Sequence, residues 1–311
     1  MEDKQSTTEK QKSQSPEFIT LDEAAKMKSG TRVTFVPGVQ ALYAEALKNI
    51  CYVKKIPLIR VLHPLMGIDK ETGEDRQQQL YDLTCQTSLP TMLHDEERPR
   101  NVWIEQLALV EQIGDAGSPS LIPDKFELRV EMFGLCAVVL AEDGLVWNIR
   151  ILNDSPLGRK YGYSEEASST APPKIAEVIR LIDSRLEAQE KLGSPYLVGN
   201  TLTAADIYWA TLSMSTLPVP PEIMPKTQQN QGMLMWFEGN SKIPEIAEAL
   251  TKRVEDHQRY ILTTYCETPA VLGGDPLWEV EINSYIEEGE NNFKADYLVT
   301  LIIGIVEQVS F

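Results

Sequence analysis

The chain has 311 residues, of which 42% are hydrophobic, so it is long enough for about two domains with packed cores. Its 46 acidic residues outnumber the 29 Lys and Arg residues, which gives a formal net charge of −17. This balance argues against nucleic acid, whose binding needs clustered positive charge, and it disfavours an anionic membrane surface.

Cysteine and histidine are sparse and scattered. The four cysteines include no CxxC pair, and the three histidines show no ligand-like spacing. The pattern predicts neither a disulfide framework nor a metal site, and reduced thiols fit a cytoplasmic protein. Residues 1–15 have no apolar segment of the secretory type, and the apolar run LVTLIIGIV near the C-terminus is about half the length of a spanning helix. We therefore expect a soluble protein.

Residues 1–30 are expected to form an N-terminal extension. The first 18 residues are polar and too poor in apolar side chains to order themselves, so we expect a flexible tail. Residues 19–30 could add one short helix, opened by Asp22 and closed by Gly30.

Residues 31–116 alternate between β-rich and helical patterns. Runs rich in β-formers occur at 32–36 and 57–62, with a helical pattern between them at 40–55. After a charged stretch come two more predicted strands, 90–94 and 101–104, joined as a polar hairpin, and an amphipathic helix at 104–114. The order β-α-β, then β-β-α, predicts one small mixed sheet with flanking helices.

Residues 117–126 fit an interdomain linker, and residues 127–262 form an all-α domain by their periodicity. Thr203 and Asp206 have the Thr-x-x-Asp spacing of a helix cap. The Met- and Trp-rich segment 232–239 either lines an apolar pocket or packs in the core. Residues 263–311 are a C-terminal extension, whose apolar stretch 295–309 should pack over the domain cleft or in a dimer interface.

Four short motifs in this order resemble those of the soluble glutathione transferases: SLPTML (88–93), WIEQLALVEQI (103–113), SPSLIPD (118–124) and GNTLTAADIYWA (199–210). The likeness covers about residues 31–262. It implies an N-terminal thioredoxin-like domain that binds glutathione, followed by the all-helical domain of that family. It also implies a homodimer.

The resemblance assigns the glutathione-binding residues. The Leu89-Pro90 bond is expected to be cis, and the backbone of Leu89 should bind the cysteinyl part of glutathione. Glu105 and Gln106 stand where the family has an acid followed by Ser, so they should bind the γ-glutamyl end; a helix N-terminus favours a carboxylate there. The alternative for this pair is an ordinary first turn of a helix, in which an acid suits the helix dipole.

The resemblance does not supply the residue that activates the thiol. Family members carry Tyr, Ser or Cys after the first strand, whereas this chain has Phe35, Gly38 and Val39 there. The remaining candidates are polar groups near this turn: Thr34, Gln40, Tyr43 and the backbone N–H groups at the start of the first helix.

Two functions remain open. The first is a transferase that joins the thiol of glutathione to an electrophilic hydrophobic compound, as in detoxification, or an isomerase that uses the same thiolate; Phe133, Trp147 and Trp209 would form the apolar half of its cleft. The second is a non-catalytic module that binds ligands or proteins. The missing Tyr, Ser or Cys favours the second, and the retained Leu89-Pro90 and Glu105-Gln106 positions favour the first.

Overall fold

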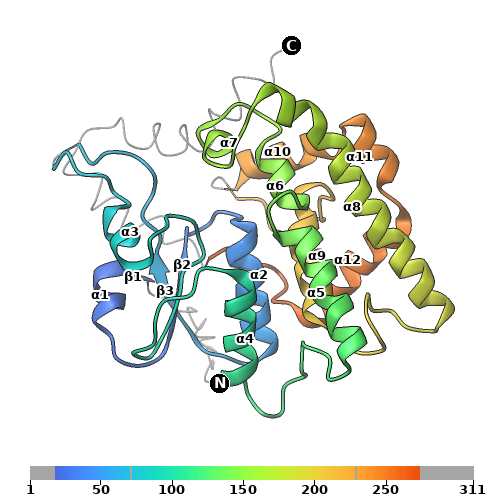
Figure 1. Cartoon of the computed structure of the whole chain (residues 1–311), viewed down its shortest axis with the longest axis horizontal. Helices are drawn as coiled ribbons and strands as arrows, with labels where there is room; N and C mark the ends of the chain where they lie inside the picture. The colour runs from blue at the N-terminus through green and yellow to red at the C-terminus, as the bar shows by residue number, and fades with distance from the viewer. Residues whose placement is uncertain (1–17, 71, 228–229, 274–311) are drawn as a thin grey trace, which may run out of the picture.

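The structure is a computed structural model, and it describes residues 18–70, 72–227 and 230–273. These residues form a small sheet with flanking helices next to a larger group of helices, as Figure 1 shows. The first domain is built mainly from residues 18–113 and the second from residues 126–265.

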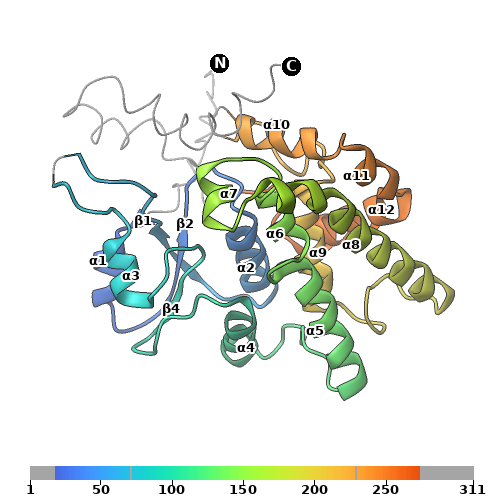
Figure 2. The same ribbon diagram turned by 45° about the horizontal axis from the view of Figure 1, so that its top comes forward.

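The first domain contains one four-stranded sheet of order β1-β3-β2-β4: β1 (Phe18–Ile19), β2 (Thr31–Phe35), β3 (Leu58–Leu62) and β4 (Met92–His94). The first three strands are parallel and β4 is antiparallel to β2. Its helices are α1 (Leu21–Lys26), α2 (Leu42–Val53), α3 (Gln78–Thr84) and α4 (Trp103–Ile113). In Figure 2, α2 and α4 lie between the sheet and the helical domain, and α1 and α3 lie on the other side. This layout confirms the predicted thioredoxin-like fold.

Two predictions for this domain need correction. Residues 18–26 are not outside the domain, because β1 pairs with β3 and α1 packs beside it, opened by a capping box of Thr20 and Glu23 rather than by Asp22. Residues 101–104 do not form a strand. Arg100 alone makes an antiparallel bridge to Met92, and α4 begins at Trp103, whose ring packs against the helical domain.

The second domain is all-helical, as predicted. Its helices are α5 (Phe126–Leu140), α6 (Leu145–Arg150), α7 (Pro156–Lys160), α8 (Glu165–Lys191), α9 (Ala204–Leu212), η1 (Ser213–Ser215), α10 (Gln231–Asn240), α11 (Pro244–Ala249) and α12 (Lys252–Tyr265). The stretch Phe126–Arg150 is apolar and long enough to span a membrane, but most of it is buried in the fold as α5 and α6, which is usual for core helices.

One continuous apolar core joins the two domains. Leu47 and Ile50 on α2 and Trp209 on α9 are fully buried in it, and α2 packs directly against α9. Burial of this kind is the main source of stability, at roughly 25 cal/mol per Å² of apolar surface. The first domain therefore has a fixed orientation relative to the helices.

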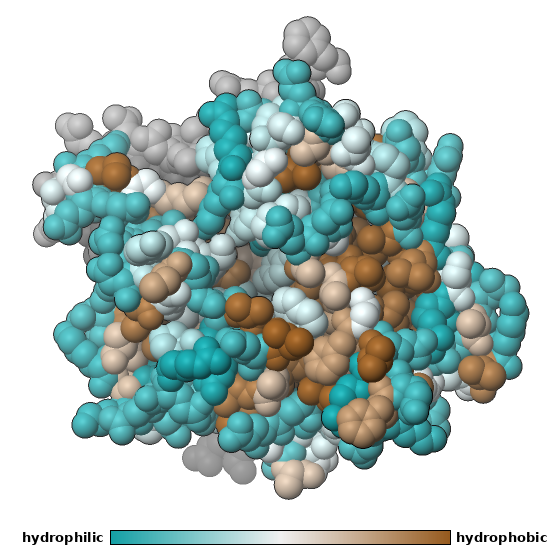
Figure 3. All heavy atoms as spheres, in the orientation of Figure 1, coloured by the Kyte–Doolittle hydropathy of each residue, from teal (hydrophilic) through white to brown (hydrophobic). Residues whose placement is uncertain are grey.

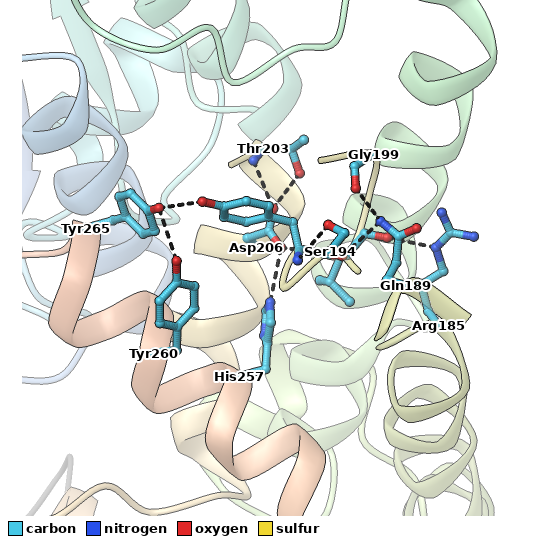
Figure 4. A network of polar contacts seen from close by, with 11 residues as sticks. Arg185, Gln189, Ser194, Gly199, Thr203, Asp206, His257, Tyr260 and Tyr265 are labelled. Carbon is cyan, nitrogen blue, oxygen red and sulfur yellow. Dashed lines mark hydrogen bonds and ion pairs between the residues drawn. The ribbon is translucent and has the colours of Figure 1, made fainter. Parts of the chain in front are cut away.

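Asp206, at the start of α9, is the centre of a buried polar network in the helical domain (Figure 4). Its carboxylate accepts hydrogen bonds from the N–H and the hydroxyl of Thr203, both at 2.8 Å, and from the N–H of Leu197 at 2.7 Å. Nε2 of His257 on α12 lies 3.1 Å from the same carboxylate. The predicted Thr203–Asp206 cap is therefore present, and it also ties α9 to α12.

Residues 266–273, called here the C-terminal strap, run from the end of α12 back to the first domain. The N–H of Gly38 donates to the carbonyl of Leu272 at 2.9 Å. The beginning of the predicted C-terminal extension is thus built into the fold. The apolar stretch 295–309, predicted to cover the cleft or a dimer interface, lies outside the described residues.

The strap is held to α2 by a buried cluster of charges. Lys48 lies 3.0 Å from the carboxylate of Glu45 and donates to that of Glu267 at 2.8 Å. Glu45 in turn accepts from the N–H of Gly273 at 2.7 Å. Burial alone would lower the pKa of Lys48, but the two carboxylates outweigh it and hold that pKa above its ordinary value.

Candidate functional site

A cleft of about 420 Å³ lies between the two domains. On one side it is lined by the turn between β2 and α2, by the segment that follows β3, and by residues 87–89 next to Pro90. On the other side it is lined by α6, α7 and α10. The ends of the parallel strands β2 and β3 open onto it, which is where open α/β sheets bind ligands.

Pro90 marks one corner of the cleft, and the Leu89-Pro90 bond is cis, as predicted. Leu89 lines the cleft, and neither its N–H nor its carbonyl has a hydrogen-bond partner among the described residues. The next residue, Thr91, is paired with Thr34 through two bonds, Thr34 N–H to Thr91 carbonyl and Thr91 N–H to Thr34 hydroxyl. Thr34 is therefore committed to the sheet, and Leu89 presents an unused donor and acceptor.

Glu105 and Gln106 do not line the cleft. The Gln106 side chain is 3% exposed, and its amide donates to the carbonyls of Pro90 at 3.0 Å and Arg100 at 3.1 Å. Glu105 forms a two-point pair with Arg98, whose guanidinium lowers the carboxyl pKa. Gln106 therefore holds the Pro90 strand against α4. Contact of either residue with glutathione stays a prediction.

The turn between β2 and α2 carries the candidates for thiol activation. Phe35 is buried in the core, and Val39 and Gln40 line the cleft. Gln40 is 2% exposed; its amide nitrogen lies 3.3 Å from the sulfur of Met214, and its amide oxygen has no partner among the described residues. The N–H of Gly38 is already donated to Leu272 of the C-terminal strap.

The N-terminus of α2 opens onto the cleft at residues 40–43. No side chain caps this helix, and the N–H groups of residues 42–44 have no acceptor among the described residues. Unpaired N–H groups at a helix start carry partial positive charge and stabilise an anion such as a thiolate. The sequence predicted this role for these backbone groups as one alternative.

Tyr43, a candidate for thiol activation in the sequence, uses its hydroxyl in a contact between the two domains. Its hydroxyl donates to the carbonyl of Leu140 at 2.7 Å, across the domain boundary. Burial raises the pKa of this phenol, so it stays protonated near neutral pH. Tyr43 lines the cleft with its ring, but its hydroxyl is already used.

His63 is a cleft residue that the sequence did not single out. It directly follows β3, and its Nδ1 atom is buried without a partner among the described residues. Burial and the nearby charge of Lys160 lower its pKa to about 4, so the ring is neutral at pH 7. The histidines have no metal-ligand spacing in the sequence. The position of His63 at the end of a predicted parallel strand is the signal that could have identified it.

The apolar wall differs from the predicted one. Trp209 is in the core, Phe133 packs against Trp103, and Trp147 contacts the edge of Tyr161, so none of the three predicted residues lines the cleft. The wall is formed instead by side chains from α6 and α10: Val146, Ile149, Met233, Trp236 and Phe237. Part of the segment 232–239 thus faces the cleft, and Phe237 also belongs to the core.

The charge of the cleft is opposite to that of the chain. Four basic residues line it: Lys70, Arg76, Arg150 and Lys160. No Asp or Glu among the described residues does so. In a chain of net charge −17 this is a local reversal, and it favours an anionic ligand. No group of three or more potential metal ligands gathers anywhere in the described part of the chain.

No family model and no curated protein matches the chain by sequence. Among solved structures, glutathione transferase Xi 1 from Trametes versicolor superposes with a TM-score of 0.52 at 15% identity, over 77% of this chain and 84% of that one. Na-GST-3, a monomeric glutathione transferase from the hookworm Necator americanus, gives 0.47 at 14% identity, over 76% and 92%. A tau-class enzyme from mango, Mangifera indica, gives 0.44 at 13%, over 75% and 97%. The likeness to the Trametes versicolor protein shows that this chain has the fold of the soluble glutathione transferases.

Proposed function

We propose that this chain, with its glutathione-transferase fold, binds glutathione in the interdomain cleft and transfers its sulfur to an electrophilic hydrophobic compound. The observation that carries the proposal is that the N–H and carbonyl of Leu89, at the cleft edge, have no partner within the described ranges. An extended peptide pairs with such a donor and acceptor as an added strand would. The cysteinyl residue of glutathione is a peptide unit of this kind.

The thiol would then lie toward the start of α2. The N–H groups of residues 42–44, which no described residue accepts from, would lower the pKa of the bound thiol. The side-chain amide of Gln40 would add a donor once its nitrogen turns from Met214. The apolar side chains of α6 and α10 hold the electrophile nearby. The thiol loses its proton to solvent, and the thiolate forms a carbon–sulfur bond to the electrophile while the bond from that carbon to its leaving group breaks; with 1-chloro-2,4-dinitrobenzene the leaving group departs as chloride. Lys70 and Arg76, on the segment after β3, supply positive charge for the glycyl carboxylate.

A non-catalytic ligand-binding or protein-interaction module is the second candidate. The observation that favours it is the absence, among the described residues, of an uncommitted side-chain hydroxyl or thiol beside the start of α2. Phe35 has none, and the hydroxyl of Tyr43 is bonded to Leu140. A cytosolic location and a part in detoxification also stay predictions.

Calorimetric titration with glutathione, followed by turnover with 1-chloro-2,4-dinitrobenzene, tests the proposal. Ophthalmic acid, which has a methyl group in place of the thiol, is the matched ligand, and we expect it to bind about tenfold more weakly than glutathione. Gln40→Ala should remove part of this preference and lower kcat/KM about tenfold. Gln79→Ala, an exposed change on α3, is the control and should change neither.

Each outcome decides between the two candidates. Binding with turnover supports the transferase. Binding without turnover would reject the transferase in favour of an isomerase or a non-catalytic binding module. Absence of binding at millimolar glutathione would overturn it.

We also propose a homodimer, and an exposed apolar face supports the proposal. Phe126 and Val130 on α5 are 74% and 73% exposed, and Ile104 on α4 is 43% exposed. Figure 3 shows apolar side chains gathered over α4 and α5. A contiguous apolar patch of this kind marks an interaction surface.

We expect the full chain to sediment as a dimer and Phe126→Asp/Val130→Asp to sediment as a monomer, because two buried charges oppose association. Leu192→Asp, at a residue 78% exposed on the end of α8, is the control and should remain dimeric. Analytical ultracentrifugation gives the masses. A monomeric wild type would contradict the prediction.

A further inference from the structure

One guanidinium on the helical wall of the cleft has no acidic partner among the described residues. Arg150 is the last residue of α6, and its guanidinium carbon lies 4.5 Å from the ring centre of Tyr43 and 4.1 Å from that of Tyr161. In the described part of the chain it forms no hydrogen bond or ion pair, and no carboxylate lines the cleft. The two rings hold the plane of the guanidinium and leave the N–H groups on its edge available to an anion.

The neighbouring cation has a different use. Nζ of Lys160 donates to the carbonyl and the hydroxyl of Thr87 at 3.1 and 2.9 Å, so it binds α7 to the loop before Pro90. The Tyr161 hydroxyl is likewise 2.9 Å from that of Ser88. These contacts fix the wall that carries Arg150. Arg150 differs from Lys160 in that, within the described part of the chain, its guanidinium contacts aromatic rings and no hydrogen-bond acceptor.

Arg150 also stands beside the apolar wall. Ile149 precedes it on α6, and Met233 and Trp236 from α10 line the same cleft. A compound that fills this part of the cleft therefore meets an apolar surface and, at one end, a positive charge that no described carboxylate neutralises. A guanidinium held in place in a partly dry site favours a charged partner over water.

We propose that the substrate side of the cleft accepts an aromatic monoanion, whose negative group contacts Arg150 and whose ring packs on the wall of Trp236. The inference adds a substrate class to the proposed function and rests on it only for the reaction. Binding of such a compound needs no glutathione. The two can therefore fail separately.

The test compares two fluorescent probes with the same aromatic body, 8-anilinonaphthalene-1-sulfonate and the uncharged N-phenyl-1-naphthylamine. The full chain is titrated with each in the absence of glutathione. We expect the anion to bind about tenfold more tightly, which corresponds to about 1.4 kcal/mol. Arg150→Gln should remove this preference and leave the affinity for the neutral probe unchanged. Arg150→Lys should keep most of it, because the charge remains.

Trp236→Leu tests where the probes bind. If both lie on the proposed wall, this change should lower the affinity for both by a similar factor. Melting curves check that every variant is folded. Equal binding of the two probes to the wild type, or an unchanged preference in Arg150→Gln, would overturn the proposal. A retained preference together with no glutathione binding would leave this inference standing and reject the transferase function.

Discussion

Asp206→Ala is expected to lower the free energy of unfolding by about 3–5 kcal/mol, because the change leaves several buried donors without an acceptor. The carboxylate is fully buried and accepts from the N–H and hydroxyl of Thr203 and from the N–H of Leu197, and it faces His257. These groups come from the loop before α9 and from α12, whereas Asp206 itself is on α9 (Figure 4). Losing the carboxylate should loosen the contacts of α9 with both.

Urea denaturation followed by circular dichroism measures this loss. Asp206→Asn should lie between the wild type and Asp206→Ala, because its one carbonyl oxygen replaces only part of the acceptor set. Asp256→Ala is the matched control: its exposed carboxylate pairs with Lys252 on the surface of α12, and we expect a change below about 0.5 kcal/mol. A loss below about 1.5 kcal/mol in Asp206→Ala would show that the network is not needed.

Lys48→Met is the second change with a large expected effect, a loss of about 3–5 kcal/mol. The ammonium group is 5% exposed and lies between the carboxylates of Glu45 and Glu267. Methionine fills a similar volume but leaves Glu45, which is 3% exposed, as a buried charge without its cation. The strap should then separate from α2, since its contacts with Lys48 are lost.

Two further variants separate the effect of the buried Glu45 charge from the effect of losing a lysine. Glu45→Gln combined with Lys48→Met should recover part of the loss, because no uncompensated charge remains buried. Lys55→Met, which removes an exposed lysine paired loosely with Asp115, should have almost no effect. Hydrogen exchange over residues 266–273 reports the strap directly. If the amides of residues 266–273 exchange as slowly in Lys48→Met as in the wild type, the charge cluster does not hold the strap in place.

Sequence patterns predicted those features that depend on neighbouring residues. The Thr203–Asp206 spacing and the Leu89-Pro90 motif are short, and both have the predicted local geometry in the structure. The strand predicted at 101–104 failed for the opposite reason. Its β-rich composition is overridden by the ring of Trp103, which packs against Phe133 and Tyr208 of the helical domain at the start of α4.

The site was only partly predictable, because its geometry depends on residues far apart in the chain. Glu267 approaches Lys48 from 219 positions away, so no local pattern signals their pairing. Gln106 has the expected place after the hairpin, but only the fold shows that its amide is used by Pro90 and Arg100. Arg150 is one of 29 basic residues in an acidic chain, and its isolation from carboxylates appears only in three dimensions.

The C-terminal strap returns the end of the helical domain to the first domain through hydrogen bonds. The helical domain leaves the first domain through residues 114–125 and returns to it through residues 266–273, so it is attached at both ends to the same small sheet domain. A domain attached at one point can rotate about that hinge, whereas attachment at two separate points opposes such a rotation. Access to the cleft must therefore depend on loops and side chains at its mouth rather than on separation of the domains. A chain shortened to end at Tyr265 would lose the second fastening and gain the freedom to open.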